Sequence, residues 1–95
     1  MRFELSRKAE ADLDDIRDYS VGQFGVDRTI DYLDALEHAF SRILNFPDIG
    51  PARPDIGERM RSLPVGEHRI FYERESQSIL ILRVLHKRMD LERYL

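Results

Sequence analysis

The sequence predicts an α+β fold in which a short N-terminal strand precedes an antiparallel helical hairpin packed on a small antiparallel β-sheet, in the order β-α-α-β-β-β. Three observations predict it. Residues 2–5 alternate polar and apolar side chains, residues 7–46 carry apolar side chains at helical spacing on both sides of a glycine-containing break, and residues 59–85 contain three short apolar runs separated by turn residues. The 95 residues, 42% hydrophobic and 35% charged, are expected to form one domain spanning residues 1–95.

The first helix is expected to begin directly after the strand formed by residues 2–5. Ser6 is a suitable N-cap, because its hydroxyl oxygen can accept a hydrogen bond from a free backbone N–H. Acidic side chains fill the early turns, where the helix dipole favours them, and we expect them to point outward. The helix should end near Gly22 and Gly25. Its apolar side consists of Ala9, Leu13, Ile16 and Tyr19, and its outward acidic side chains are Glu10, Asp12, Asp14 and Asp15.

The second helix is expected to have Asp27 as its N-cap and to stop before Pro47. Very few residues separate the two helices, so they should form an antiparallel hairpin. The joint apolar side of this hairpin must be covered by another layer, which the strands supply. The apolar side of the second helix consists of Ile30, Leu33, Leu36, Phe40, Ile43 and Leu44.

A loop rich in proline and glycine is expected at residues 47–58. Three strands should follow at Arg59–Leu63, His68–Arg74 and Ile79–Leu85, with turns at residues 64–67 and 75–78. The third strand is the most apolar, so we place it centrally in the sheet. Residues 86–95 are expected to form either a terminal helical turn or an extended arm.

Composition and charge exclude several classes of function. The absence of cysteine excludes a disulfide scaffold, a thiol nucleophile and a thiolate metal site, and it is compatible with the reducing cytoplasm, where we expect the protein. We expect no membrane association, because no apolar stretch approaches membrane-spanning length and the first residues lack the apolar core of a signal peptide. The net charge of −3 argues against direct nucleic-acid binding, although residues 51–95 carry nine basic against seven acidic side chains.

No motif of a known catalytic or nucleotide-binding site is present, and the three histidines His38, His68 and His86 lack the spacing of metal ligands. We therefore expect no metal and no cofactor, and an exposed helix position for His38. Strand pairing can bring sequence-distant arginines onto one sheet face, where they would be able to hold a phosphodiester. The residues alone favour a plainer alternative, in which the strand arginines face solvent while apolar strand residues pack. In this alternative, Arg69 and Arg83 face solvent while Ile70, Tyr72 and Ile79 pack in the core. The full set of candidate arginines is Arg59, Arg61, Arg69, Arg83, Arg88 and Arg93, with His86 and Tyr94 nearby in sequence.

Four segments resemble a known family along essentially the whole chain. They are LSRKAEADLDDIRDYS, FGVDRTIDYLDAL, MRSLPVGEHRIFYE and ILILRVLHKRMDLERYL, and the most specific part is the run from Arg83 to His86 followed by Arg88, Met89 and Asp90. The chain resembles a ParE-type toxin of the RelE/ParE superfamily, the toxic half of a type II toxin–antitoxin system. The resemblance implies a helical hairpin on an antiparallel sheet, neutralisation by a ParD-like antitoxin, and inhibition of DNA gyrase without nuclease activity.

The related RelE branch supplies the alternative function, a ribosome-dependent mRNA endoribonuclease. Arg69 matches the strand arginine of that branch, and Arg88 and Tyr94 have a spacing similar to its terminal Arg/Tyr pair. Arg59 and Arg61 stand roughly where that branch has lysines, and arginine does not replace lysine in handling protons, because it stays charged. We therefore favour a gyrase-directed binding toxin over an enzyme.

These expectations assign residues to two surfaces. An antitoxin segment that folds on binding is expected to lie in a groove bordered by the hairpin and the sheet edge, with arginines meeting its carboxylates. The target is expected to contact the C-terminal residues. The antitoxin-binding residues would be Arg59, Arg61, Arg69, Leu33, Leu36 and Phe40; the target-binding residues would be His86, Arg88 and Tyr94; and a ribonuclease would use Arg69, Arg88 and Tyr94.

Overall fold

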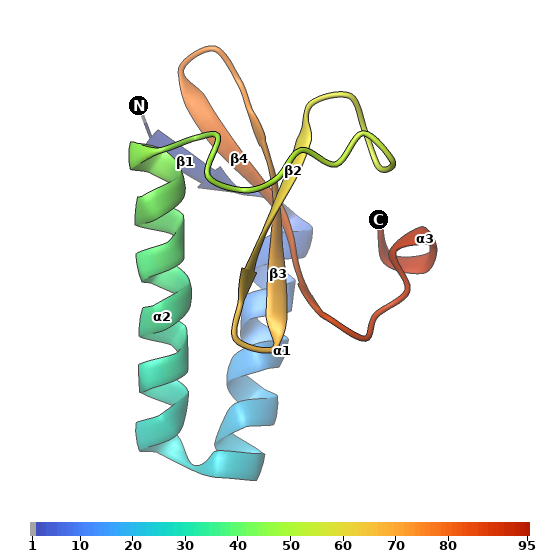
Figure 1. The fold of residues 1–95 in the computed structure, drawn as a ribbon. Helices are drawn as coiled ribbons and strands as arrows, with labels where there is room; N and C mark the ends of the chain where they lie inside the picture. The colour runs from blue at the N-terminus through green and yellow to red at the C-terminus, as the bar shows by residue number, and fades with distance from the viewer. Residues whose placement is uncertain (1) are drawn as a thin grey trace.

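The computed structural model describes residues 2–95 and confirms the predicted order of elements (Figure 1). A strand and a helical hairpin come first, three strands follow, and the chain ends in one helical turn. The bounds are β1 Arg2–Leu5, α1 Arg7–Phe24, α2 Val26–Asn45, β2 Met60–Val65, β3 His68–Arg74, β4 Ser78–His86 and α3 Leu91–Tyr94.

The four strands form one sheet in the order β1-β4-β3-β2, with the apolar strand β4 in the interior as predicted. The pairs β2–β3 and β3–β4 are antiparallel, as predicted, whereas β1, for which the sequence predicted no partner strand, runs parallel to β4 and makes the sheet mixed. The hairpin is the reason. Its two helices return the chain to the end of the molecule where β1 began, so β2 and β4 both start from the same end as β1 (Figure 1).

The predicted helix ends are confirmed at three of four places. Ser6 caps α1 by accepting the Ala9 N–H at 3.0 Å, and α2 stops at Asn45, two residues before Pro47. Helix α1 passes through Gly22 and ends at Phe24. The N-cap assigned to Asp27 was wrong, because the residue before α2 is Gly25, whose φ of 85° makes the sharp joint between the helices.

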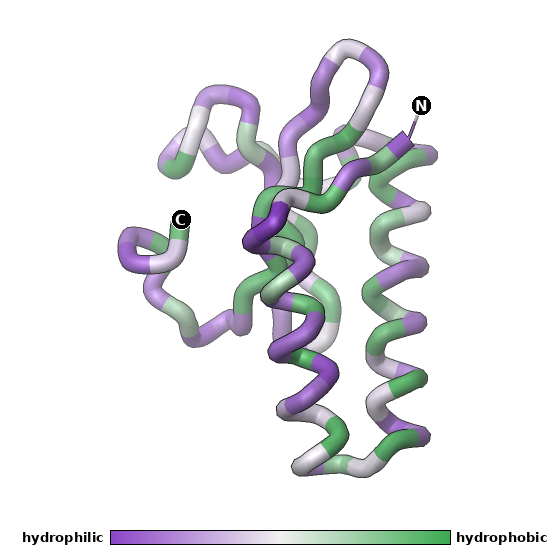
Figure 2. The backbone as a smooth tube through the Cα atoms, turned by 180° about the vertical axis from the view of Figure 1, so that it is seen from behind, coloured by the Kyte–Doolittle hydropathy of each residue, from purple (hydrophilic) through white to green (hydrophobic). Residues whose placement is uncertain are grey.

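The main core lies between the hairpin and one face of the sheet, and it includes the predicted strand residues Ile70, Tyr72 and Ile79, each fully buried. Two residues of the predicted apolar stripes are exposed instead: Tyr19 at 65% and Ile30 at 51%. Both lie near the bend of the hairpin, which extends past the end of the sheet and carries apolar residues there (Figures 1 and 2). The overhanging end of the hairpin therefore has no layer to cover it.

The loop before β2 is fixed to the core by one buried tyrosine. The Tyr72 hydroxyl donates to the Pro47 carbonyl at 2.7 Å and accepts the Gly50 N–H at 2.9 Å. Arg61 adds a bond from Nη1 to the Gly50 carbonyl at 2.7 Å. These bonds hold the loop across the outer edge of β2, where Ser62 N–H also donates to the Pro51 carbonyl. An edge covered in this way is protected from pairing with other chains.

The strand β2 is displaced from its predicted range and extends through Val65. Pro64 is therefore part of the strand, and the turn to β3 contains two residues, Gly66 and Glu67, with Gly66 at a φ of 55°. A proline is tolerated here because β2 is the edge strand, which has no strand neighbour on its outer side.

The second face of the sheet carries a smaller buried group. Phe71 and Leu85 are almost completely buried, and the guanidinium carbon of Arg53 lies 5.8 Å from the centre of the Phe71 ring. Arg53 comes from the loop before β2, and both this loop and α3 lie on the opposite side of the sheet from α2 in Figure 1. The C-terminal helical turn predicted as one of two possibilities is thus present, as α3.

Candidate partner-binding groove

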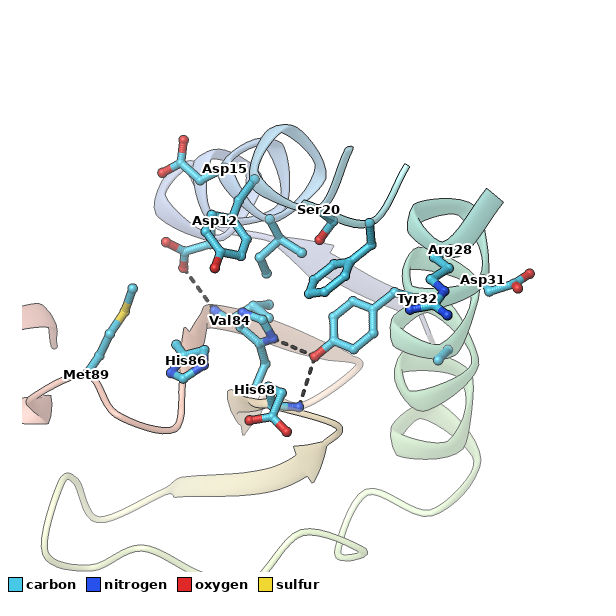
Figure 3. Close-up of a pocket in the computed structure, with 15 residues that line it drawn as sticks. Asp12, Asp15, Ser20, Arg28, Asp31, Tyr32, His68, Val84, His86 and Met89 are labelled. Atoms are coloured by element: carbon cyan, nitrogen blue, oxygen red, sulfur yellow. Dashed lines mark hydrogen bonds between the residues drawn. The ribbon is translucent and has the colours of Figure 1, made fainter. Parts of the chain in front are cut away.

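A groove of about 770 Å³ opens between the overhanging part of the hairpin and the ends of β3 and β4 (Figure 3). Helix α1 supplies one wall, α2 the other, and the strand ends form the floor. The groove is lined by Asp12, Asp15, Ile16, Tyr19, Ser20, Phe24, Arg28, Asp31, Tyr32, Ala35, Glu67, His68, Val84, His86 and Met89.

The groove is mostly apolar, and several of its large apolar side chains are unusually exposed. Phe24 is 57% exposed beside the exposed Tyr19, and Met89 is 41% exposed. Charged groups stand at the margin: Asp15 and Asp31 on the two helices are exposed, with Arg28 as a cationic neighbour. An apolar channel bordered by charged side chains can accept the apolar face of an amphipathic segment, while the margin selects its charge pattern.

A tyrosine and two histidines form the floor of the groove. The Tyr32 hydroxyl lies 2.5 Å from His68 Nδ1 and accepts the Glu67 N–H at 3.1 Å. The rings of His68 and His86 meet edge to face, with centres 5.3 Å apart. Burial lowers the pKa of His68, and a charge on His86 lowers it further. Burial also raises the pKa of the Tyr32 phenol. Both shifts favour the neutral forms of His68 and Tyr32, which suits contact with apolar groups.

The β2–β3 turn is tied to the segment that leaves β4. Lys87 N–H donates to the Glu67 carbonyl at 2.9 Å, and the Lys87 ammonium lies 2.8 Å from the Glu67 carboxylate. The hydrogen bond from Lys87 lowers the pKa of Glu67. This end of the groove is consequently bordered by two segments that are hydrogen-bonded to each other.

The other end of the floor is held by Asp12. Strand β1 pairs with β4 only as far as Ile81, so the next part of the β4 edge lacks a strand neighbour. The Asp12 carboxylate takes that place by accepting the Val84 N–H at 2.9 Å, and it also accepts bonds from Arg83 Nε and Nη2, both at 2.8 Å. Figure 3 shows the bond between Asp12 and Val84. Asp12 had been expected to point outward, and Arg83 to face solvent; their side chains are instead only 10% and 14% exposed.

The residues assigned to antitoxin binding are divided among the core, the loop and the surface. Leu36 and Phe40 are 1% and 2% exposed in the core, and Leu33 is half-buried against it, because the sheet covers that side of α2. Arg61 is engaged by its own loop, with the Gly50 carbonyl and Asp48 as partners. Arg59 and Arg69 are exposed, and Arg69 lies beside Leu85 on the face of the sheet away from the main core.

The residues assigned to the target lie along the C-terminal segment. His86 is half-buried at the groove floor, Arg88 is exposed in the turn that follows, and Tyr94 is 37% exposed on α3. The Arg88 N–H donates to His86 Nδ1 at 3.1 Å. Within residues 2–95, no side-chain hydrogen bond joins Arg69, Arg88 and Tyr94, the trio that a ribonuclease would use.

The sequence interpretation missed Asp12 and Tyr32 as members of this site, and it named Arg83 without foreseeing its pairing with Asp12. A signal for Asp12 existed, because it lies three residues after Ala9 and four before Ile16, on the buried side of α1. Tyr32 and the partner of Arg83 gave no such signal, since they depend on strands and helices that meet only in the folded chain. His38 is exposed on α2, as predicted, and residues 2–95 contain no group of three or more His, Asp or Glu side chains placed to hold a metal ion.

Helices α1 and α2 are the two long helices of the fold. Neither these nor any other helix in the described part of the chain combines the length and apolar character that a transmembrane span needs.

The fold and groove define a small α+β protein with an open apolar channel, and comparison with known proteins supplies the family. A family model described as "ParE toxin of type II toxin-antitoxin system, parDE" matches residues 3–91. Toxin ParE1 of Mycobacterium tuberculosis (strain H37Rv) is 39% identical over 95 residues, covering 99% of this chain and 97% of that protein. Toxin ParE1 of Caulobacter vibrioides is 36% identical over 93 residues, covering 98% and 96%.

A solved structure shows the same fold. A chain of the chromosomal ParDE toxin–antitoxin system from P. aeruginosa superposes with a TM-score of 0.78 at 24% identity, covering 90% of this chain and 95% of that one. The chain belongs to the ParE toxin family of type II toxin–antitoxin systems, as its resemblance implied.

Proposed function

We propose that this ParE-family toxin is held inactive by a ParD-like antitoxin whose C-terminal segment lies in the groove beneath the overhanging hairpin. The observation that carries the proposal is the exposure of Tyr19 and Phe24 in the walls of an apolar channel. Large exposed apolar patches are uncommon on proteins that act alone. An amphipathic helix placed there would cover both side chains and extend the core beyond the end of the sheet.

The antitoxin would also continue toward the sheet, where Arg59 and Arg69 are free to meet its carboxylates. Arg69 is the better probe, because Arg61 is engaged by its own loop and its replacement would disturb the fold. Arg69→Glu should weaken the complex by reversing one charge on an exposed strand position. An unchanged dissociation constant would remove Arg69 from the contact surface.

Ala35 allows a direct test of the groove. It lines the groove from α2 and is exposed, whereas Ser41 is exposed on the same helix but outside the groove. Ala35→Arg should obstruct the channel and reduce antitoxin affinity by about a hundredfold or more, as expected for a blocked interface centre. Ser41→Arg adds the same side chain and should leave affinity unchanged. Equal affinities of the two variants would place the antitoxin elsewhere.

For the toxic activity itself, we propose inhibition of DNA gyrase through the C-terminal segment that contains His86, Arg88 and Tyr94. Membership of the ParE family supports this target. Cytoplasmic expression without antitoxin should arrest growth, and the purified protein should inhibit DNA supercoiling by gyrase. Unimpaired supercoiling in the presence of excess toxin would exclude this target.

A messenger-RNA cleavage assay in the arrested cells distinguishes the ribonuclease alternative from gyrase inhibition. Cuts in the ribosomal A site that disappear in an Arg69→Ala variant would establish RelE-like activity. Intact messages together with inhibited gyrase would support the binding toxin.

A further inference from the structure

Arg83 connects the body of the protein to its C-terminal helical turn. Its Nε and Nη2 atoms both bind the Asp12 carboxylate, while Nη1 donates to the backbone carbonyl of Tyr94 on α3. One guanidinium thus joins α1, β4 and α3, and its carboxylate partner Asp12 lies 71 positions before it in the sequence. Only arginine has a planar side-chain group whose three nitrogen atoms can donate to two separate partners in this way.

Helix α3 has little else to fix its position. It contains four residues, none of them buried, and its own hydrogen bonds run within the segment, from Tyr94 N–H to the Asp90 carbonyl and from Leu95 N–H to the Leu91 carbonyl. A helix this short is not stable in isolation. Among the hydrogen bonds formed by residues 2–95, the bond from Arg83 to Tyr94 is the one that joins α3 to the sheet.

The guanidinium of Arg83 is itself well oriented. The Asp12 carboxylate receives two parallel bonds at 2.8 Å and is fixed in turn by the Val84 N–H. Because both side chains are largely shielded from water, these charge-assisted bonds are stronger than a surface ion pair would be. The hydrogen bonds that Arg83 donates to Asp12 also raise the pKa of Arg83, so the guanidinium remains charged.

We propose that Arg83, oriented by Asp12, is a positioning residue that holds α3 against the sheet and so presents residues 87–95 to the target in one arrangement. The effect on the target rests on the proposed function, whereas the anchoring of α3 does not. A fixed segment binds more tightly than a mobile one, because its ordering entropy has already been lost on folding.

Nuclear magnetic resonance relaxation of the full chain tests the anchoring. In Arg83→Lys, the ammonium can keep the ion pair with Asp12 but cannot also reach the Tyr94 carbonyl. The amide order parameters of residues 91–95 should fall from about 0.8 to below about 0.6, while those of the sheet stay constant. Arg74→Lys, at an exposed strand end, is the matched control and should change neither set.

Asp12→Asn provides a second variant of unchanged size, which can still accept the Val84 N–H while losing the ion pair. It should lower the same order parameters, and it keeps the test valid if Arg83→Lys does not fold. Order parameters of residues 91–95 that stay at the wild-type value in either folded variant would overturn the proposal.

Inhibition of the target and affinity for the antitoxin are measured separately from the order parameters. Arg83→Lys should require about tenfold more toxin for half-inhibition of the target, while its affinity for the antitoxin in the groove stays within about twofold. If residues 91–95 lose order while toxicity is unchanged, the inference that Arg83 anchors α3 stands. The C-terminal segment is then removed from the proposed target surface.

Discussion

The Tyr32 hydroxyl and His68 Nδ1 lie 2.5 Å apart at the floor of the groove and join the first half of α2 to the start of β3. The same hydroxyl accepts the Glu67 N–H of the β2–β3 turn and lies 3.3 Å from the Val65 carbonyl. This tyrosine therefore fixes the distance between the overhanging hairpin and the end of the sheet. The width of the groove depends on it.

We expect the stability of the protein to fall on acidification because of His68. Burial lowers its pKa below the ordinary 6.5, His86 lowers it further, and Glu67 and Asp12 act in the opposite direction. A lowered histidine pKa means that the unfolded chain binds the proton first as pH decreases. The contribution of His68 is thus fully present above about pH 6.5 and declines as the pH falls from there to the folded-state pKa.

Melting temperatures of the wild type and of His68→Gln, measured from pH 7.5 to 5.0, test this expectation. The wild type should lose stability more steeply over that range than the variant does. Parallel curves for the two proteins would show that His68 does not contribute to the pH dependence.

Gly50 and Gly22 should respond in opposite directions to the same substitution. A Cβ at Gly50 would lie 2.7 Å from the Ser62 carbonyl oxygen and 2.9 Å from the Tyr72 ring, so Gly50→Ala should destabilise the protein by about 1–3 kcal/mol or more. A Cβ at Gly22, inside α1, has no neighbour within 4 Å, so Gly22→Ala should stabilise by about 0.5–1 kcal/mol. Urea denaturation of both variants gives the comparison, and two changes of the same sign would contradict it.

Tyr72→Phe should destabilise the protein although it removes a single oxygen atom. The variant leaves the Gly50 N–H and the Pro47 carbonyl without their partner at a site closed to water. The expected loss of unfolding free energy is about 1–3 kcal/mol. Tyr19→Phe, at a side chain 65% exposed, is the control and should change stability by less than about 0.5 kcal/mol. Similar stabilities for the two variants would mean that water replaces the buried hydroxyl.

Replacing Tyr19 and Phe24 by serine should separate partner binding from folding. Both side chains lie at the uncovered end of the hairpin, so unfolding free energy should change by less than about 0.5 kcal/mol for each. Antitoxin affinity should drop at least about tenfold, because aromatic anchors contribute disproportionately to interfaces. Calorimetric titration with the antitoxin measures this loss. Retained affinity in the double variant would argue against the groove as the docking surface.

The sequence alone determined the features that depend on neighbours along the chain. Ser6 was recognisable as a helix cap, and the burial of Ile70, Tyr72 and Ile79 followed from alternation within strands. These patterns can be read because helical and extended backbones repeat at fixed intervals. The family resemblance depended on the same local runs of residues.

The tertiary structure decided the contacts between helices and strands that are distant in the sequence. The parallel pairing of β1 with β4, the overhang that exposes Tyr19, and the bonds between Asp12 and Arg83 each join segments that local patterns treat separately. An acidic residue on a helix usually points to solvent, and only the open edge of β4 makes Asp12 an internal partner. The physical reason is that an unpaired strand N–H must find an acceptor, and where that acceptor comes from depends on how the whole chain is packed.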